Sequence, residues 1–174
     1  MRARAIKLAL SCAAVAALSG MPAVAAENIG EAVAVIDQAS TVGSVGEQTL
    51  AVGMAVHRGD LVKTDEIGEA QLLFNDGTRL VVGPNSEMML DDFVFRSGAT
   101  ENQFVVRALN GAFRFITGEA TKDSYLIHTP SAIIGVRGTA FDFAVTPGNT
   151  QVLLLHGGVN MCGNNFGCTR ADVE

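Results

Sequence analysis

The 174-residue chain is predicted to be all-β, folded as a β-sandwich or roll or as a short β-solenoid-like module of many short strands. From Ile29 onward, apolar and polar residues alternate with period two, and no long segment has the 3.6-residue period of a helix. Glycine, proline, asparagine and aspartate interrupt this alternation roughly every 8–12 residues, as the turns of an all-β protein do. The apolar content of 48% is too high for a disordered chain.

The first 26 residues are predicted to be a helical secretory signal peptide that precedes the fold. Three basic residues within the first seven positions are followed by the uncharged run Leu8–Leu18 and by the small residues Ala23–Ala26. The apolar run is shorter than the roughly 20 residues that a membrane-spanning helix needs. We therefore expect a signal peptide at 1–26, one all-β domain at 27–174, and no stable membrane insertion after cleavage.

The charge balance of the chain is acidic, with 18 acidic and 12 basic residues and a net charge of −6. Loss of the signal peptide removes three basic residues and no acidic one, so the mature chain carries a net charge of −9. An acidic surface disfavours binding to nucleic acid or to anionic lipid. The sequence thus predicts a free exported protein, periplasmic or secreted, that binds no nucleic acid.

Turns are expected where glycine, proline and asparagine cluster. The strongest signal is Asp76-Gly77, which we interpret as a type I′ hairpin turn with positive φ at both central positions. Gly135 and Gly138 are expected to form a tight strand–turn–strand device that places Arg137 at its centre. Further turns are expected at 83–86, 110–111, 129–130, 147–149 and 157–158.

The two cysteines of the mature chain, Cys162 and Cys168, are interpreted as a disulfide that closes a small loop, because the compartment is oxidising. The alternatives are a metal site or a redox pair. Zinc takes four ligands, and the three histidines show no ligand spacing relative to the cysteines. A redox dithiol usually separates its cysteines by two residues, whereas five separate these.

The ordered motifs of the mature chain resemble the FecR family. They are G-D-L-V-K-T at 59–64, G-E-A-Q-L at 68–72, D-G-T-R-L at 76–80, G-P-N-S at 83–86, L-N-G-A-F-R at 109–114, T-P-x-A-x-x-G-V-R-G-T-x-F at 129–141 and V-L-L-L-H-G-G-V at 152–159. The resemblance implies an all-β periplasmic module without catalytic activity. Founding members of the family are inner-membrane regulators that relay the loaded state of an outer-membrane iron transporter to a cytoplasmic sigma factor.

The chain departs from that plan, because it shows neither an N-terminal sigma-binding helical region nor a lasting membrane helix. We therefore expect a non-enzymatic periplasmic module that binds a protein partner of the envelope or a ligand, in envelope signalling or in regulation linked to transport. Two alternatives are a structural envelope protein that interacts with the cell wall, and a secreted hydrolase. The sequence identifies neither the partner nor the oligomeric state.

The candidate binding site is Arg137 with Gly135, Gly138 and Thr139. The guanidinium group would bind an acidic group, helped by backbone N–H groups of the glycine-rich segment. The alternative is a structural arginine that bonds loop carbonyls or a carboxylate, and it is favoured because paired structural charges outnumber binding sites. The carboxylates considered for this pairing are Asp60, Asp76 and Asp142.

No catalytic residue, metal ligand or cofactor site is predicted. Ser86, Ser124 and Ser131 lie in no G-x-S-x-G motif, and no serine, histidine and aspartate can be grouped as a triad. Calcium ligation by Asn75-Asp76 and Asp91-Asp92 is the remaining metal hypothesis, but no D-x-D-x-D-G loop is present and the first pair is interpreted as a turn.

Overall fold

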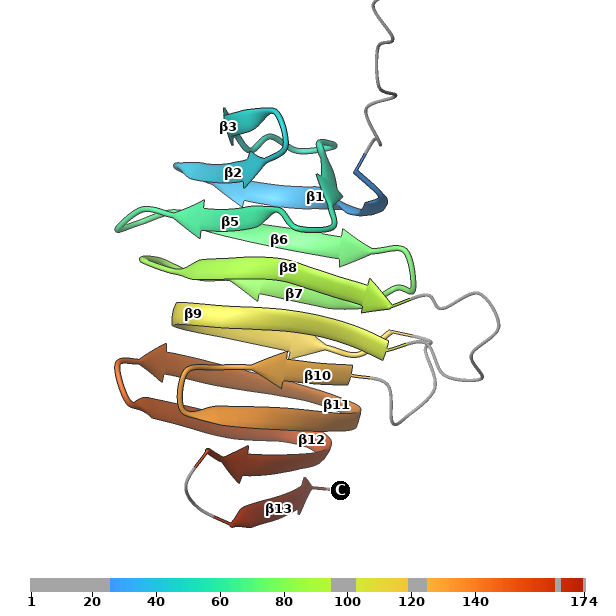
Figure 1. The fold of residues 1–174 in the computed structure, drawn as a ribbon, viewed down its shortest axis with the longest axis vertical. Coiled ribbons are helices and arrows are strands. Elements are labelled where there is room, and N and C mark those ends of the chain that lie inside the picture. The colour runs from blue at the N-terminus through green and yellow to red at the C-terminus, as the bar shows by residue number, and fades with distance from the viewer. Residues whose placement is uncertain (1–25, 95–102, 119–124, 165–166, 174) are drawn as a thin grey trace, which may run out of the picture.

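The computed structural model describes residues 26–94, 103–118, 125–164 and 167–173, and these form thirteen strands in one continuous sheet (Figure 1). The predicted all-β class is therefore confirmed. The expected signal-peptide helix lies outside the described residues. Within the described ranges, no helix has the length and apolar character needed to cross a membrane.

The strands follow one another along the chain with short connections. They are β1 (Asn28–Ile36), β2 (Ala39–Gly43), β3 (Gly46–Thr49), β4 (Ala55–His57), β5 (Leu61–Thr64), β6 (Glu69–Phe74), β7 (Arg79–Val82), β8 (Glu87–Val94), β9 (Gln103–Ile116), β10 (Tyr125–His128), β11 (Ala132–Thr146), β12 (Asn149–Gly163) and β13 (Cys168–Val173).

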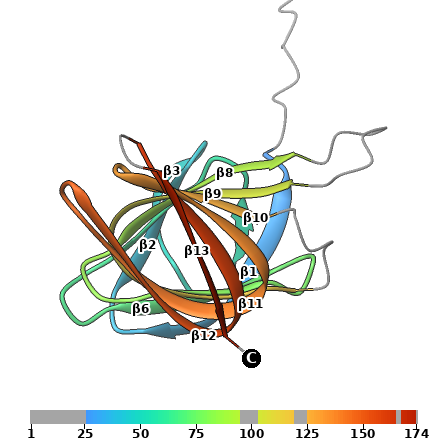
Figure 2. The same cartoon turned by 90° about the horizontal axis from the view of Figure 1, so that it is seen from below.

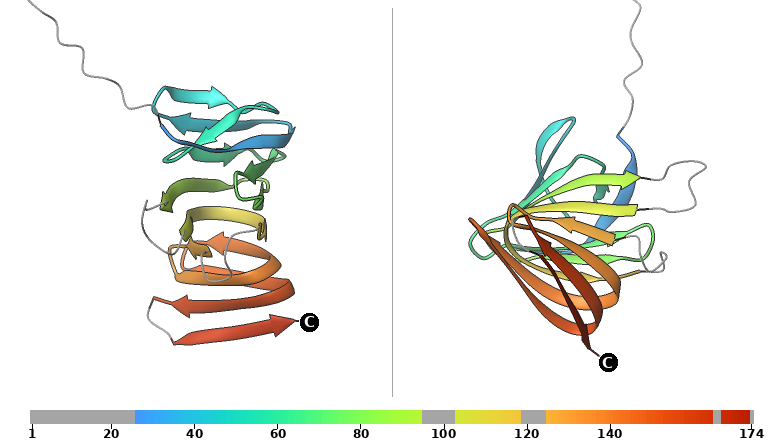
Figure 3. Two further views of the ribbon diagram at one scale, coloured as in Figure 1. Left: turned by 90° about the vertical axis from the view of Figure 1, so that its right-hand side faces the viewer. Right: turned by 60° about the horizontal axis from the view of Figure 1, so that its bottom comes forward.

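The sheet is folded into two layers that face each other (Figures 2 and 3). One layer contains β4, β1, β6 and β7, and it continues into the second halves of β9 and β11 and the first half of β12. The other contains β3, β2, β5 and β8, and it continues through the first half of β9 into β10, the remainder of β11 and β12, and β13. The β9–β10 pair is parallel, whereas the other pairs are antiparallel.

Three long strands pass from one layer to the other without ending. β9 pairs with β8 up to Asn110 and with β7 and β11 beyond it. The bends in β9, β11 and β12 coincide with Gly111 (φ 116°), Gly138 (φ 57°) and Gly157 (φ 85°). Positive φ costs glycine little, so each strand can bend at its glycine, cross to the other layer and then continue to pair with its neighbours.

The structure corrects the turns expected at 110–111, 135–138 and 157–158. All three segments lie inside continuous strands, so they bend β9, β11 and β12 rather than end them. The glycine signal was correctly located, but glycine at positive φ serves both a reversing turn and a bend in a strand. The two outcomes differ only in whether neighbouring strands continue to pair beyond the glycine.

The hairpin at Asp76-Gly77 is confirmed, but its turn type differs from the expectation. Gly77 has a φ of 81°, whereas Asp76 is not in the positive region. The Gly77 amide donates to the Phe74 carbonyl at 2.9 Å, and the Phe74 amide donates to the Thr78 carbonyl at 2.9 Å. This pattern fits a type I turn followed by a glycine bulge, which needs only one residue with positive φ.

The space between the layers is filled by the inward side chains of both, and phenylalanines of the strands form a large part of it. Phe113 and Phe143 stack with ring centroids 4.9 Å apart, and Phe115 lies 5.6 Å from Phe141. The largest fully buried side chains include Tyr125, Phe74, Phe115, Phe141, Leu72, Leu80, Met88 and Leu90. Each buried phenylalanine contributes about 1.5–3 kcal/mol relative to an exposed one.

Hydroxyl groups fix the backbone at the bends. The Ala112 amide donates to Ser86 Oγ at 3.0 Å, and a Cβ on Gly111 would overlap that hydroxyl group. At the next bend Thr139 Oγ1 donates to the His156 carbonyl, and the Thr139 amide donates to Thr117 Oγ1 at 3.0 Å. Side-chain oxygens thus satisfy backbone groups where the strand ladder is interrupted.

The bends provide a test that separates backbone strain from steric overlap. Gly138 and Gly157 both have positive φ, but a Cβ on Gly138 would meet open space, whereas one on Gly157 would overlap the Gly138 carbonyl oxygen. We expect Gly138→Ala to lower the free energy of unfolding by about 1 kcal/mol and Gly157→Ala by about 3 kcal/mol or more. Urea denaturation of both variants measures this difference, and equal losses would contradict the proposed overlap.

Candidate functional site

The segment 129–141, which the sequence singled out, forms the turn after β10 and the first ten residues of β11. Its start is fixed by hydroxyl groups that join this turn to the beginning of β12. Thr150 Oγ1 lies 2.7 Å from both Thr129 Oγ1 and Ser131 Oγ, and Thr129 Oγ1 also accepts from the Ala132 amide at 2.9 Å. This cluster sets where β11 begins, and therefore which of its residues point outward.

The alternation of β11 assigns each residue of the G-V-R-G-T run a different position. Val136 points into the core and is 3% exposed, whereas Arg137 is exposed on the outer face. Gly138 bends the strand, and Thr139 is buried, with its hydroxyl group donated to the His156 carbonyl. Arg137 is thus held on a strand between an inward residue and a bend.

A cavity of about 310 Å³ lies on this face of the sheet, across β10 to β13. Gly135 on β11 is paired with Asn160 on β12, and Asn160 is paired in turn with Arg170 on β13. We call this cavity the Arg137 groove; it is lined by Leu126, Gly135, Arg137, Asn160, Arg170 and Asp172, among others.

The charges of the Arg137 groove are only partly paired. Arg170 bonds Asp172 through two hydrogen bonds, Nε to Oδ2 at 2.8 Å and the terminal nitrogen to Oδ1 at 3.1 Å. The hydrogen bond from Arg170 holds the pKa of the Asp172 carboxyl below its ordinary value, and the positive charges of Arg170 and Arg137 add to this effect. The guanidinium group of Arg137 makes no hydrogen bond or ion pair with any residue that the structure describes.

The four predicted site residues therefore divide into two pairs. Arg137 and Gly135 line the groove, whereas Gly138 and Thr139 form the bend that positions Arg137. The carboxylates considered as structural partners of Arg137 are bonded elsewhere: Asp142 to Arg114, Asp76 to Thr78 and Tyr125, and Asp60 to the His57 amide.

Sequence reasoning missed the contributions of β12 and β13 to the groove. Gly158 was interpreted as part of a turn, so Asn160 was not placed beside Gly135. Arg170 and Asp172 are two residues apart, and this spacing puts both on one face of a strand. The two-residue separation of Arg170 and Asp172 was therefore the sequence signal that could have predicted their ion pair.

A second feature that the sequence did not predict is the hydrogen-bond network around Asp76. Tyr125 donates its hydroxyl group to Asp76 Oδ2 at 2.9 Å, and Thr78 Oγ1 donates to the same oxygen at 2.8 Å. Thr78 is fully buried, and its hydroxyl oxygen also accepts from the Gly118 amide at 3.2 Å. Asp76 was interpreted first as part of a turn, and in the structure it also anchors the start of β10, which carries Leu126.

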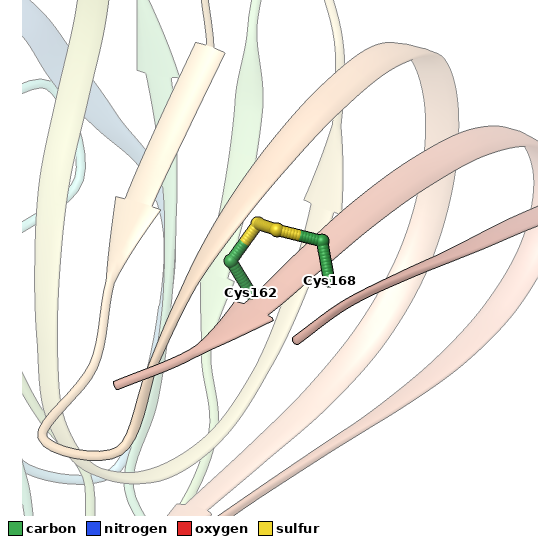
Figure 4. Close-up of a disulfide and its surroundings, with 2 residues drawn as sticks. All are labelled: Cys162 and Cys168. Carbon is green, nitrogen blue, oxygen red and sulfur yellow. A yellow bond between two sulfur atoms is a disulfide. The ribbon is translucent and has the colours of Figure 1, made fainter. Parts of the chain in front are cut away.

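The predicted disulfide is confirmed. Cys162 and Cys168 face each other across β12 and β13 and are bonded (Figure 4). All six residues of β13 are exposed, so this strand buries no side chain in the core. Its attachment depends on backbone pairing with β12 and on the disulfide, and the groove residues Arg170 and Asp172 lie on it.

A larger cavity, of about 510 Å³, lies on the outer face of the opposite layer over β7, β9 and β11. Its arginine is already paired, since Arg114 Nε bonds Asp142 Oδ1 at 2.6 Å. This hydrogen bond lowers the pKa of the Asp142 carboxyl and raises the pKa of Arg114. Because the smaller cavity holds an arginine without a partner among the described residues, the Arg137 groove is the stronger candidate.

Comparison with known families decides the classification. The family model described as FecR protein matches residues 60–160, which is more than half of the chain. The chain belongs to the FecR family. The resemblance inferred from the motifs is thereby confirmed, and the match includes the Asp76 turn, all three bends and the Arg137 groove up to Asn160. The family is one of envelope-associated regulatory proteins.

Solved structures support the fold. This FecR-family chain is similar to two crystal structures, at 1.65 Å and 2.50 Å, described as those of a "putative anti-sigma factor" from Parabacteroides distasonis ATCC 8503. The TM-scores are 0.51 and 0.52, with 16% and 15% sequence identity over 64% of this chain. The match spans half of the length of those proteins. No curated protein matches the sequence.

The Asp76 network can be tested by removing one hydroxyl group. Tyr125→Phe retains the ring, which packs edge-on against Phe115, and removes the hydrogen bond to Asp76. We expect the free energy of unfolding to fall by about 1 kcal/mol. In an Asp76→Ala background the same change should cost less, because only the 3.2 Å hydrogen bond from Thr78 Oγ1 to the Tyr125 hydroxyl group is then left to lose. Equal costs in both backgrounds, measured by urea denaturation, would contradict the network.

The attachment of β13 can be tested by replacing both cysteines with serine. We expect the amides of β13 and those of β12 paired with it to exchange hydrogen faster, while amides in β6 and β7 are unchanged, because β13 has no buried side chain. The loss of global stability should be about 2 kcal/mol or less. Hydrogen exchange followed by mass spectrometry measures both regions, and unchanged protection of β13 would contradict this dependence on the disulfide.

Proposed function

We propose that this chain is a non-catalytic regulatory module of the periplasm that binds a protein partner of the envelope. Membership of the FecR family supports a regulatory role, because the family is not one of known enzymes. The likeness to a protein described as a "putative anti-sigma factor" points in the same direction. The proposal includes export by the segment 1–26 and a role in envelope signalling or in regulation linked to transport.

The observation that carries the proposal is the state of Arg137. An exposed guanidinium group stands on a bent strand beside a cavity, and no described residue pairs with it. A structural arginine would instead bond one of the carboxylates around it, as Arg114 bonds Asp142. Arginine is also the residue that most often carries binding energy at protein interfaces, together with tyrosine and tryptophan.

The sheet edge beside the groove offers a second means of binding. β13 is the last strand of its layer among the described residues, and all its side chains are exposed. An edge strand presents unpaired N–H and C=O groups, which can pair with a strand of another protein. In this proposal the partner adds a strand to β13 and places an acidic group near Arg137.

Capture of the partner from envelope extract tests this function. The mature chain is immobilised as wild type, as Arg137→Ala and as Arg79→Ala, which removes an exposed arginine from β7 in the opposite layer. We expect one protein to be retained by wild type and by Arg79→Ala and lost with Arg137→Ala. Neither substitution should change stability by more than about 0.5 kcal/mol, because both side chains are exposed.

Two outcomes would contradict the proposed function. One is that the wild-type chain retains no specific protein from the envelope extract. The other is that Arg137→Ala retains the same protein as well as wild type does, in which case the partner binds a different surface. Thermal denaturation of all three proteins shows that any loss of capture comes from the surface rather than from unfolding.

A further inference from the structure

Gly135 is a glycine that the chain's own structure does not require. Its φ is not in the positive region, unlike that of Gly138 or Gly157. A Cβ built on it would lie 3.7 Å from the Asn160 carbonyl oxygen and 3.9 Å from Leu126 Cδ2, which are ordinary contact distances. Glycine in the middle of a strand lowers stability, because it has no side chain to pack and its unfolded chain is more flexible.

Gly158, the other glycine of the groove, has a local explanation. The Asp172 carboxylate lies where its side chain would be, with Oδ1 2.5 Å from a Cβ built on Gly158. That glycine allows β13 to place the Arg170–Asp172 pair above β12. In contrast, no atom of the described residues would overlap a Cβ on Gly135, which lines the Arg137 groove.

The charge of the side chains around Gly135 favours an anionic ligand. Two guanidinium groups, Arg137 and Arg170, line the groove together with one carboxylate, Asp172, so one positive charge is not neutralised locally. This local excess stands out in a chain whose net charge is −6. A guanidinium group matches a carboxylate with two parallel N–H bonds, and such charge-assisted bonds are stronger than neutral ones.

The dimensions of the groove favour a short peptide segment. A cavity of about 310 Å³ is at the small end of the range for ligand pockets, which suits one or two amino-acid side chains. The groove crosses β10 to β13 and reaches the exposed edge strand, where an extended chain can continue its backbone pairing. Leu126 adds an apolar side chain to the lining of the groove beside Gly135.

We propose that the Arg137 groove binds an acidic side chain of an extended protein segment. The absence of a side chain at Gly135 leaves the space that this acidic side chain occupies. Arg137 binds the carboxylate, Asn160 is available as a polar neighbour, and Arg170 remains paired with Asp172. Gly135 is the specificity-determining residue, because a larger uncharged residue there fills part of the groove without changing its charge. This inference rests on the proposed function, since it assumes that the partner is a protein.

The test uses the mature chain and a fluorescein-labelled tetraglutamate peptide, with tetraglutamine as the neutral probe. Binding is measured by fluorescence anisotropy for wild type, Gly135→Val, Arg137→Gln and the control Arg79→Gln. We expect tetraglutamate to bind wild type and Arg79→Gln equally, and Gly135→Val and Arg137→Gln to bind about tenfold or more weakly. Added salt should weaken binding to wild type, and tetraglutamine should not bind.

The thermal stability of Gly135→Val separates a binding role from a structural one. We expect its melting temperature to equal or exceed that of wild type, because valine is favoured in strands and a Cβ at this position makes only ordinary contacts. A clear fall in melting temperature would show that the fold itself needs the glycine, and the inference would be overturned. Equal binding of tetraglutamate by Gly135→Val and wild type would overturn it as well.

Two further outcomes separate this inference from the proposed function. If tetraglutamate does not bind wild type while the envelope partner is still captured through Arg137, the acidic-segment inference fails and the proposed function stands. If an oligosaccharide of glucuronic acid binds the groove and tetraglutamate does not, the ligand is an acidic glycan and the inference is likewise overturned. If tetraglutamate binds but no envelope protein is captured, the groove chemistry is supported and the proposed function fails.

Discussion

The fold depends on backbone hydrogen bonding that continues where strands bend from one layer of the sheet to the other. Buried N–H and C=O groups need partners, so a strand that crosses between layers must resume pairing immediately after it bends. β9, β11 and β12 do so at Gly111, Gly138 and Gly157, where positive φ turns the backbone. Because these three strands belong to both layers, the layers form one continuous sheet around a single core.

The motifs of the FecR family are explained mainly by the chemistry of these bends and turns. Ser86 of G-P-N-S meets Gly111 of L-N-G-A-F, and Thr139 of G-V-R-G-T bonds the carbonyl of His156, just before Gly157. Asp76 of D-G-T links its own turn to Tyr125. These motif residues therefore hold the fold, whereas Gly135 and Arg137 of 129–141 lie on the outer face and line the groove.

The position of the groove follows from the same architecture. Inward residues of β10 to β12 are committed to the core or to the bends, so only outward positions are free for binding. The outermost strand, β13, has no core residue and is joined to β12 by pairing and by the disulfide, yet it supplies one wall of the groove. The candidate site thus combines the bent strand β11 with an edge strand that backbone pairing and a disulfide join to β12.

Much of the molecule was predictable because its signals are local. Period-two alternation predicted the all-β class, and the cysteine spacing together with the expected export predicted the disulfide. Whether Gly111, Gly138 and Gly157 end strands or bend them was decided by the tertiary structure, because positive φ permits both and only the pairing beyond each glycine distinguishes them. The groove, too, exists only after folding, since β10 to β13 bring Leu126, Gly135, Asn160 and Arg170 together from separate parts of the chain by strand register.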